Sequence, residues 1–268
     1  MSNLLAWEPW IRVAAFVGAF LLLAAWESWA PRRRASFDRA ARWPHNLALV
    51  VLGTLLLRAV FPLAAVGAAA LAAQAGWGLL NTWPVSRATA FVASLVALDF
   101  AIWAQHRMFH RVPLLWRLHR MHHADLDFDV TTALRFHPFE LVLSMLIKVG
   151  IVLLLGAPPL AVLVFEVLLN ASSLFNHANV ALSPRVDAWL RWLVVTPDMH
   201  RVHHSWEPRE TDSNFGFNLP WWDRLFGTYL AQPRLGHQGM TVGLHEFRDP
   251  RELRLDRMLL QPFAATQR

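Results

Sequence analysis

The chain contains no cysteine among its 268 residues. This absence excludes disulfide bonds, thiolate metal ligands and an iron–sulfur cluster held by the chain itself. The sequence also lacks a G-x-G-x-x-G dinucleotide loop and a recognisable haem module. Any redox chemistry on this chain therefore needs electrons from a separate protein.

Charged residues are scarce, at 16% of the chain, whereas hydrophobic residues make up 55% and the mean hydropathy is +0.31. Such a composition is too apolar for an ordinary soluble domain and indicates a membrane protein. The net charge of +6 comes mostly from arginines outside the apolar runs. Basic flanks of membrane helices explain it better than nucleic-acid binding, so we expect no nucleic-acid partner.

The apolar runs predict an all-α bundle with about four membrane-embedded segments or hairpins. A retained helix is favoured over a cleaved signal peptide for the first run, because its n-region is barely basic. Pro62 interrupts the second run, Ser86 is a plausible N-cap of the third, and Gly156 to Pro159 turn the last into a hairpin. The runs cover about residues 10–30, 46–77, 86–105 and 141–175.

A block of arginines, Arg32 to Arg34, follows the first run. By the positive-inside rule this loop is cytoplasmic. Counting crossings from it places every histidine cluster on the same side, at the ends of membrane helices. We expect an integral membrane protein with a cytosolic histidine-rich helical cap, in the inner membrane if the source is bacterial.

Eight histidines occur in three clusters with helical spacing. Residues three or four apart share one helix face, so each cluster can aim its imidazoles at a common point. Neutral imidazole is the commonest nitrogen ligand of transition metals, and eight such ligands are too many for one ion. The pattern predicts a two-metal centre built from His106, His110, His119, His122, His123, His200, His203 and His204.

Several acidic residues lie close to these clusters. Asp99 stands inside a membrane segment, seven residues before His106, and is expected to support the histidine site, although a bond to a neighbouring helix would also satisfy it. Asp198 precedes His200 by two residues and could orient its imidazole or cap a helix. The Asp125–Asp129 stretch lacks the glycine and glutamate of a calcium loop, which favours a solvated loop.

The order and spacing of the motifs resemble the fatty acid hydroxylase / sterol desaturase superfamily of membrane di-metal oxygenases. The resemblance covers about residues 99–230, within what we expect to be one domain over residues 1–268. It is carried by His106-Arg107-x-x-His110, Leu115-Trp116, His119-x-x-His122-His123, Arg135-Phe136-His137-Pro138, Asn176-His177-Ala178-Asn179, His200-x-x-His203-His204-Ser205 and Trp222-Asp223-Arg224-Leu225-Phe226-Gly227-Thr228.

The resemblance implies two iron ions, O2 as co-substrate and a lipid substrate such as a sterol, a fatty acyl chain or an isoprenoid. Zinc could replace iron in purified protein. The resemblance also adds His177 to the eight histidine ligands above and makes His137 either a ligand or a residue that supports one. Some relatives have a further histidine four residues before His177, where this chain has Ser173. The ligand count and any transfer of 2-hydroxylase activity therefore stay open.

The expected reaction is hydroxylation in preference to desaturation, with electrons from a ferredoxin or a cytochrome b5-type carrier and its reductase. A metal-dependent hydrolase is one alternative, but no cluster contains the carboxylate base of an H-E-x-x-H motif. A metal transporter is another, but its ligands should lie near the bilayer midplane. The motifs determine neither the lipid nor the oligomeric state.

Overall fold

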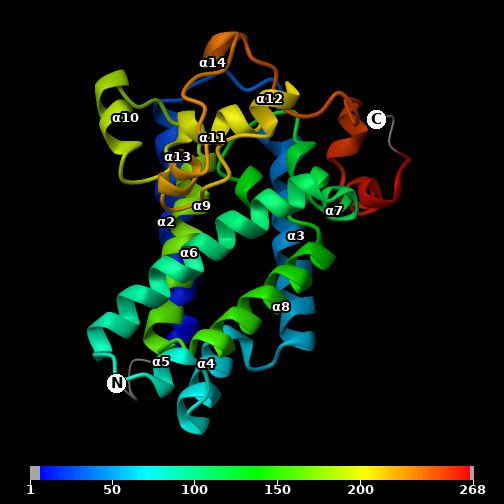
Figure 1. The fold of residues 1–268 in the computed structure, drawn as a ribbon. Helices are drawn as coiled ribbons and strands as arrows, with labels where there is room; N and C mark the ends of the chain where they lie inside the picture. The colour runs from blue at the N-terminus through cyan, green and yellow to red at the C-terminus, as the bar shows by residue number, and fades with distance from the viewer. Residues whose placement is uncertain (1–6, 266–268) are drawn as a thin grey trace.

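The structure is a computed structural model that describes residues 7–265. Five of its helical segments are long and apolar enough to cross a membrane, which identifies a membrane protein. In Figure 1 they form the lower body of the molecule. The segments are α2 (Glu8–Trp29), α3 (Arg39–Val60) with its continuation through α4 (Ala64–Ala75) and α5 (Leu79–Thr82), α6 (Arg87–Arg111), α8 (Pro138–Leu155) and α9 (Pro159–His177).

Local sequence signals set the ends of these helices. Pro62 falls in the break between α3 and α4, as predicted. Ser86 caps α6, since its hydroxyl accepts a hydrogen bond from the Thr89 amide at 3.0 Å. Gly156 ends α8 with φ +67°, a left-handed conformation that suits glycine, and Pro159 begins α9. The predicted hairpin over residues 141–175 is confirmed.

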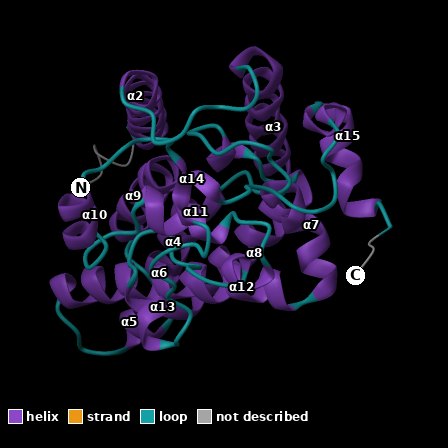
Figure 2. Ribbon diagram, turned by 90° about the horizontal axis from the view of Figure 1, so that it is seen from above, coloured by secondary structure: helices purple, strands orange, loops and turns teal. Residues whose placement is uncertain are grey.

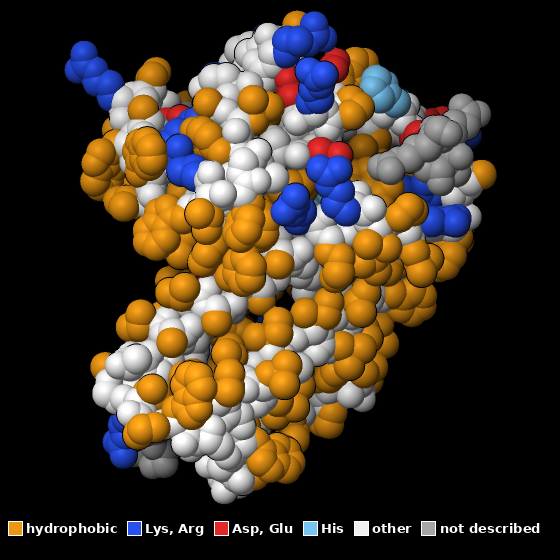
Figure 3. Space-filling model, in the orientation of Figure 1, with side chains coloured by type: hydrophobic (Ala, Val, Ile, Leu, Met, Phe, Trp, Pro, Cys, Tyr) orange, Lys and Arg blue, Asp and Glu red, His pale blue; other side chains and the backbone are white. Residues whose placement is uncertain are grey.

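Large apolar side chains cover the outside of the long helices, which matches a lipid environment. Leu22 is 74% exposed, Leu55 63% and Leu154 72%. Hydrophobic side chains gather over the lower body in Figure 3, while most basic side chains in this view lie on the upper part. The exterior therefore separates a lipid-facing zone from a polar one.

The upper part, here called the cap, consists of short helices and loops over the ends of α6 and α9. Figure 2 looks down onto it and draws only helices and loops over the described residues, so the all-α prediction is confirmed. Its elements are α7 (Pro113–His123), η1 (Thr132–Leu134), α10 (Pro184–Leu190), α11 (Pro197–His203), α12 (Pro208–Thr211), α13 (Trp221–Leu225), α14 (Gly236–Gly239), η2 (Pro250–Leu253), α15 (Leu255–Leu260) and η3 (Gln261–Phe263).

The Asp125–Asp129 stretch is not the solvated loop that the sequence suggested. Asp125 is fully buried, and its carboxylate pairs with the buried guanidinium of Arg42 at 2.6 and 2.9 Å. Asp129 accepts a third bond from Arg42 at 2.5 Å. The prediction was wrong because the cationic partner lies on α3, far away in the sequence. The pair ties the cap to a membrane helix.

Candidate metal centre

Nine buried histidines converge where the ends of α6 and α9 meet α7 and α11. They form two groups, and the candidate ligand atoms within each group lie no more than 4.8 Å from one another. These are the nine histidines that the sequence motifs predicted. One group contains His106, His110, His119, His123 and His203, and the other contains His122, His177, His200 and His204.

Helix geometry explains how α7 and α11 serve both groups. Consecutive residues on an α-helix point about 100° apart, whereas residues four apart share a face. On α7, His119 and His123 face the five-histidine group, and His122 faces the four-histidine group. On α11 and at its C-cap, His203 faces the first group and His204 the second. Each H-x2-H-H motif thus bridges two sites.

Backbone carbonyls fix the tautomer of three of these imidazoles. A carbonyl oxygen only accepts, so the ring nitrogen that faces it must carry the proton. This leaves the opposite nitrogen, Nε2, with a free lone pair. The three Nδ1–H donors reach their acceptors over 2.7–2.8 Å: His106 to Phe215, His177 to Ser173 and His203 to Ser213.

The free lone pairs point at one another. His106 Nε2 lies 3.1 Å from His119 Nε2 and 3.0 Å from His203 Nε2. In the other group, His177 Nε2 lies 3.2 Å from His122 Nε2 and 3.1 Å from His200 Nε2. Neither His106 Nε2 nor His203 Nε2 carries a proton, so their lone pairs repel each other. A cation between the two nitrogens would remove this repulsion. The donor set therefore fits a metal ion in each group.

Burial keeps these imidazoles in the neutral form that binds metals. All nine are at most 5% exposed. Burial, reinforced by the neighbouring imidazoles, holds the pKa of His122, His203 and His204 well below the usual value, and burial lowers the pKa of His119 to about 3. Both ring nitrogens of His123 and His204 are buried without a hydrogen-bond partner among the described residues, which fits metal ligands.

Two carboxylates that the sequence motifs did not reveal contact the outer side of the five-histidine group. Glu140 accepts from His119 Nδ1 at 2.7 Å, and an oxygen of Asp212 lies 3.4 Å from His110 Nδ1. Glu140 is buried in the first turn of α8, while the side chain of Asp212 is 42% exposed. The only sequence signal for Glu140 was its place in H-P-F-E, three residues after His137. Such contacts orient ligand imidazoles and raise their basicity.

The carbonyls that accept from His106 and His203 belong to a loop over residues 213–223, which two aspartates hold. Asp223 accepts from the amides of Phe215 and Gly216 at 2.9 and 2.8 Å and from the indole of Trp103 at 3.0 Å. Asp99 accepts from Asn218 and Trp222 at 2.7 and 2.8 Å. These bonds anchor the loop to α6, which itself carries His106.

The three residues expected to support the ligands occupy other positions. Asp99 bonds to the loop instead of an imidazole, so its support of the centre is indirect. Asp198 pairs with Arg32 at 3.0 Å and with Arg201, so neither the predicted imidazole bond nor the predicted cap is correct, since Thr196 caps α11. His137 caps α8 through Nδ1 and belongs to neither histidine group.

Aromatic rings enclose the centre on two sides. Phe136 stacks on His122 with a centroid distance of 4.5 Å, and Phe217 lies 5.0 Å from His106 and 5.7 Å from His200. Both phenylalanines also pack into the apolar cluster between α4, α6, α8 and α9. The side of the centre that faces the membrane interior is therefore apolar.

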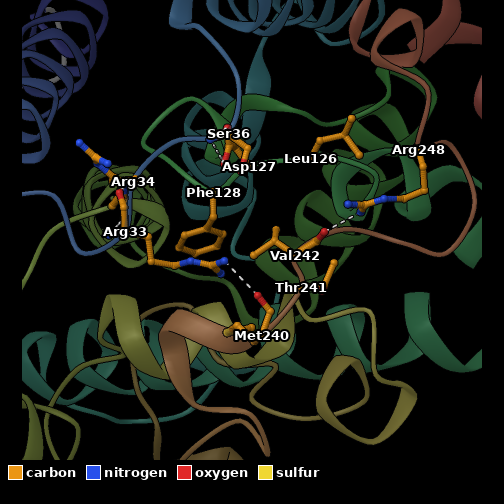
Figure 4. Close-up of a pocket in the computed structure, with 11 residues that line it drawn as sticks. Arg33, Arg34, Ser36, Leu126, Asp127, Phe128, Met240, Thr241, Val242 and Arg248 are labelled. Atoms are coloured by element: carbon orange, nitrogen blue, oxygen red, sulfur yellow. Dashed lines mark hydrogen bonds between the residues drawn. The ribbon is translucent and has the colours of Figure 1, made fainter.

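On the cap side, Phe128 separates the four-histidine group from a small basic pocket. Its ring stacks on His177 at 5.6 Å and meets His204 at 5.1 Å. The pocket measures about 180 Å³, and Arg33, Arg34 and Arg248 line it. Figure 4 shows the Phe128 ring at the pocket, with Arg33 bonded to the Met240 carbonyl and Arg248 to that of Val242.

Comparison with known proteins finds one family model, described as fatty acid hydroxylase, which matches residues 91–228. The matched range contains all nine histidines of the two groups. It also contains Glu140, Asp212 and the loop over residues 213–223.

Curated relatives include an alkylglycerol monooxygenase of Xenopus tropicalis, 29% identical over 167 residues, which are 62% of this chain and 36% of the relative. The ornithine lipid hydroxylase OlsE of Rhizobium tropici is 33% identical over 154 residues, 57% of this chain and 46% of that protein. A very-long-chain aldehyde decarbonylase, GL1-6 of Oryza sativa subsp. indica, is 25% identical over 71% of this chain and 29% of its own.

The matches to these relatives span less than half of each relative's length. No solved structure matches the chain significantly.

Proposed function

The chain belongs to the fatty acid hydroxylase family, and on that premise we propose that it is a di-iron enzyme that uses O2 to hydroxylate a C–H bond of a membrane lipid. The observation that carries the proposal is the convergence of imidazole lone pairs in two buried groups at the ends of membrane helices. The nine histidines are the proposed metal ligands.

The number and burial of the nitrogen donors support two metal ions over a single structural zinc. A structural zinc site holds one ion with four ligands, whereas the two groups here offer five and four buried imidazoles. Bound iron would supply the binding and reduction of O2.

The residues of the chain have three tasks in this reaction. The imidazoles hold the metals, and Glu140 with the carbonyls of Ser213 and Phe215 keeps the rings in the tautomer that presents Nε2. Phe136 and Phe217 exclude water from the membrane side. An acyl chain would approach along the same apolar cluster, so that one of its methylenes meets the centre.

A lipid substrate and hydroxylation are supported by the relatives and by the location of the centre. The named relatives include an alkylglycerol monooxygenase and an ornithine lipid hydroxylase, and both names specify an oxygenation of a lipid. The apolar helices give this chain direct access to the bilayer. We therefore favour hydroxylation of a membrane lipid over desaturation.

Hydrolysis is the alternative that the geometry disfavours. A hydrolase needs a carboxylate base in front of the metal, beside the bound water. Glu140 and Asp212 instead approach Nδ1, on the side of the ring away from the convergent lone pairs. These contacts suit carboxylates that orient the ligand imidazoles. Neither carboxylate is placed to remove a proton from a metal-bound water.

The decisive experiment is lipid analysis of a host with and without the gene, grown under 18O2. Hydroxylation adds 16 mass units with ordinary O2 and transfers the label into the lipid, whereas desaturation removes two mass units without label. A product that carries oxygen from labelled water would replace our proposal with hydrolysis. A host expressing the His203→Ala variant is the matched control.

We propose that a partner protein supplies the electrons. Inserting one oxygen atom of O2 into a C–H bond reduces the other atom to water, which consumes two electrons and two protons. We propose that a ferredoxin or a cytochrome b5-type carrier docks at the basic pocket over Phe128 (Figure 4), the described pocket whose wall touches two proposed ligands, His177 and His204. Purified protein with O2 and lipid should be inactive until carrier and reductase are added, and Arg33→Gln should weaken their coupling.

The cap is proposed to face the cytoplasm. The support is the arginine block at residues 32–34, which lies between α2 and α3 at the cap end of the molecule. A reporter after Arg34 or at the C-terminus should read cytoplasmic, and one near Pro158 should read external. The reverse pattern would invert the topology without affecting the chemistry.

A further inference from the structure

A second pocket lies in the cap, away from the histidine groups, and the proposed oxidation does not use it. It measures about 710 Å³ and opens between α10, the segment after α9 and the chain that follows α13. Its polar lining comes chiefly from Arg32, Asp187, Arg191, Asp198, Arg224 and Tyr229.

The two acidic residues of this pocket are already neutralised. Asp187 accepts from Arg191 and from the Thr196 hydroxyl at 2.5 Å. Asp198 pairs with Arg32 at 3.0 Å and with Arg201. With each carboxylate matched to at least one guanidinium, the remaining arginine gives the pocket an excess of positive charge.

That remaining cation is Arg224. Its guanidinium lies between two rings, 3.8 Å from the centroid of Trp192 and 3.9 Å from that of Tyr229, and it donates to the Arg191 carbonyl at 3.0 Å. No carboxylate pairs with it among the described residues. Its Nε–H and that of Arg191 are buried without an acceptor in the described part of the chain. These two N–H groups face protein and not the pocket, whereas the stack between Trp192 and Tyr229 holds the unpaired guanidinium of Arg224 rigidly at the pocket wall.

Exposed aromatic and aliphatic side chains lie beside the pocket, and one of them, Trp192, lines it. Trp189 is 64% exposed, Trp192 59%, Trp221 48% and Leu225 70%. They lie on or next to α10 and α13, and hydrophobic side chains crowd this upper-left region of the molecule in Figure 3. Exposed tryptophans of this kind settle at the boundary between acyl chains and head groups.

The packing of α13 against a membrane helix sets the depth of this region. Phe226, directly after α13, stacks on Trp103 of α6 with 4.6 Å between ring centroids. Trp103 lies eight residues before the end of α6, which is long and apolar enough to cross the membrane. The chain after α13 therefore reaches the apolar span itself, and the polar pocket beside it lies at the edge of the apolar zone, where lipid head groups begin.

We propose that this pocket binds the oxyanion of a membrane lipid head group, a phosphate or a carboxylate, with Arg224 as its principal contact and the exposed tryptophans against the acyl chains. A planar guanidinium that lines the pocket and has no carboxylate partner among the described residues suits an oxyanion. The surrounding aromatic residues select a lipid over a free anion, because only a lipid brings apolar chains to cover them. This site is separate from the proposed metal centre and does not depend on the proposed oxidation.

The test is competitive lipid binding to the full-length protein in neutral detergent, followed by native mass spectrometry. Phosphatidylglycerol and diacylglycerol with the same acyl chains are offered together. The wild type should retain phosphatidylglycerol about tenfold better than diacylglycerol, which is the effect expected of one charge-assisted hydrogen bond. Arg224→Gln should remove the preference, whereas Arg185→Gln, which deletes an exposed arginine of α10 outside the pocket, should keep it.

Three results would overturn the proposal: a wild type without preference, equal preference in the two variants, or displacement of the lipid by millimolar inorganic phosphate. The last would make the pocket a site for free phosphate. Should Arg224→Gln fail to fold, judged by metal content and thermal melting, Arg224→Lys takes its place. It keeps the charge but loses the planar stack and should lower the preference about threefold, against no change in Arg185→Lys.

Discussion

Glu140 accepts a hydrogen bond from Nδ1 of His119 at 2.7 Å, across 21 positions of sequence and between two helices. His119 is on α7 in the cap and Glu140 begins α8, a membrane helix. The bond leaves His119 Nε2 free toward His106. It makes the first turn of a membrane helix part of the proposed metal centre.

Replacing Glu140 with glutamine should therefore weaken metal binding without unfolding the protein. The amide oxygen is a weaker acceptor than a carboxylate, and loss of such a partner typically lowers metal affinity about 10–100-fold. Metal competition with a chelator of known affinity measures the change. Glu246→Gln is the control, since Glu246 contacts no histidine of either group; equal affinity in both variants would show that Glu140 does not tune the metal.

Single alanine substitutions should empty the two groups separately. His110→Ala removes a nitrogen from the five-histidine group and His200→Ala from the four-histidine group. The metal content of each variant should fall from about two ions per chain toward about one, and both variants should lose activity. His245→Ala, in an exposed histidine stacked on Trp206, should change neither quantity. A wild type that binds one ion or none would contradict the two-site proposal.

The buried pair of Asp125 and Arg42 should stabilise the fold strongly. Although burial alone raises the pKa of Asp125, the charges of Arg42 and Arg135 lower it to about 2. Because the folded pKa is below the ordinary value of 3.8, the stabilisation is present above pH 3.8 and is lost as the pH falls toward 2. Asp125→Asn leaves two buried guanidinium groups poorly compensated and should cost about 3–5 kcal/mol.

Chemical unfolding in detergent at neutral pH measures this loss. Asp127→Asn is the matched control, because within the described residues the hydrogen bonds of Asp127 come from the backbone amides of Ser36 and Phe37, and its side chain is partly exposed. A similar loss of unfolding free energy in the two variants would show that the buried ion pair does not stabilise the fold more than the partly exposed carboxylate does.

His237 should make stability depend on pH between about 4 and 6.5. Burial lowers its pKa to about 4, although the charge of Asp198, 3.5 Å away, opposes that effect. The unfolded chain takes up this proton near pH 6.5 and the folded chain only near pH 4, so stability falls as the pH falls through that window. The melting temperature of His237→Gln should fall less steeply with pH than that of the wild type, and equally steep curves would show that His237 does not cause the dependence.

The sequence by itself determined the apolar helices, their breaks at Pro62 and Gly156, and the helical spacing of the histidines. These features depend on residues a few positions apart, where helix periodicity and the chemistry of proline and glycine decide the structure. For the same reason helical spacing was enough to predict eight of the nine proposed ligands, whereas His177 was named only through the family resemblance.

Only the tertiary structure decided which histidines share a group and which carboxylates touch them. His106 and His203 are 97 positions apart, and Arg42 is 83 positions from Asp125. No local pattern reports such distances. The sequence alone therefore predicts a solvated loop at Asp125 and either a bond to the His200 imidazole or a helix cap for Asp198, and it predicts no role for Glu140. The physical reason is that a buried charge or lone pair takes its partner from whichever helix packs beside it, and that packing is a property of the whole bundle.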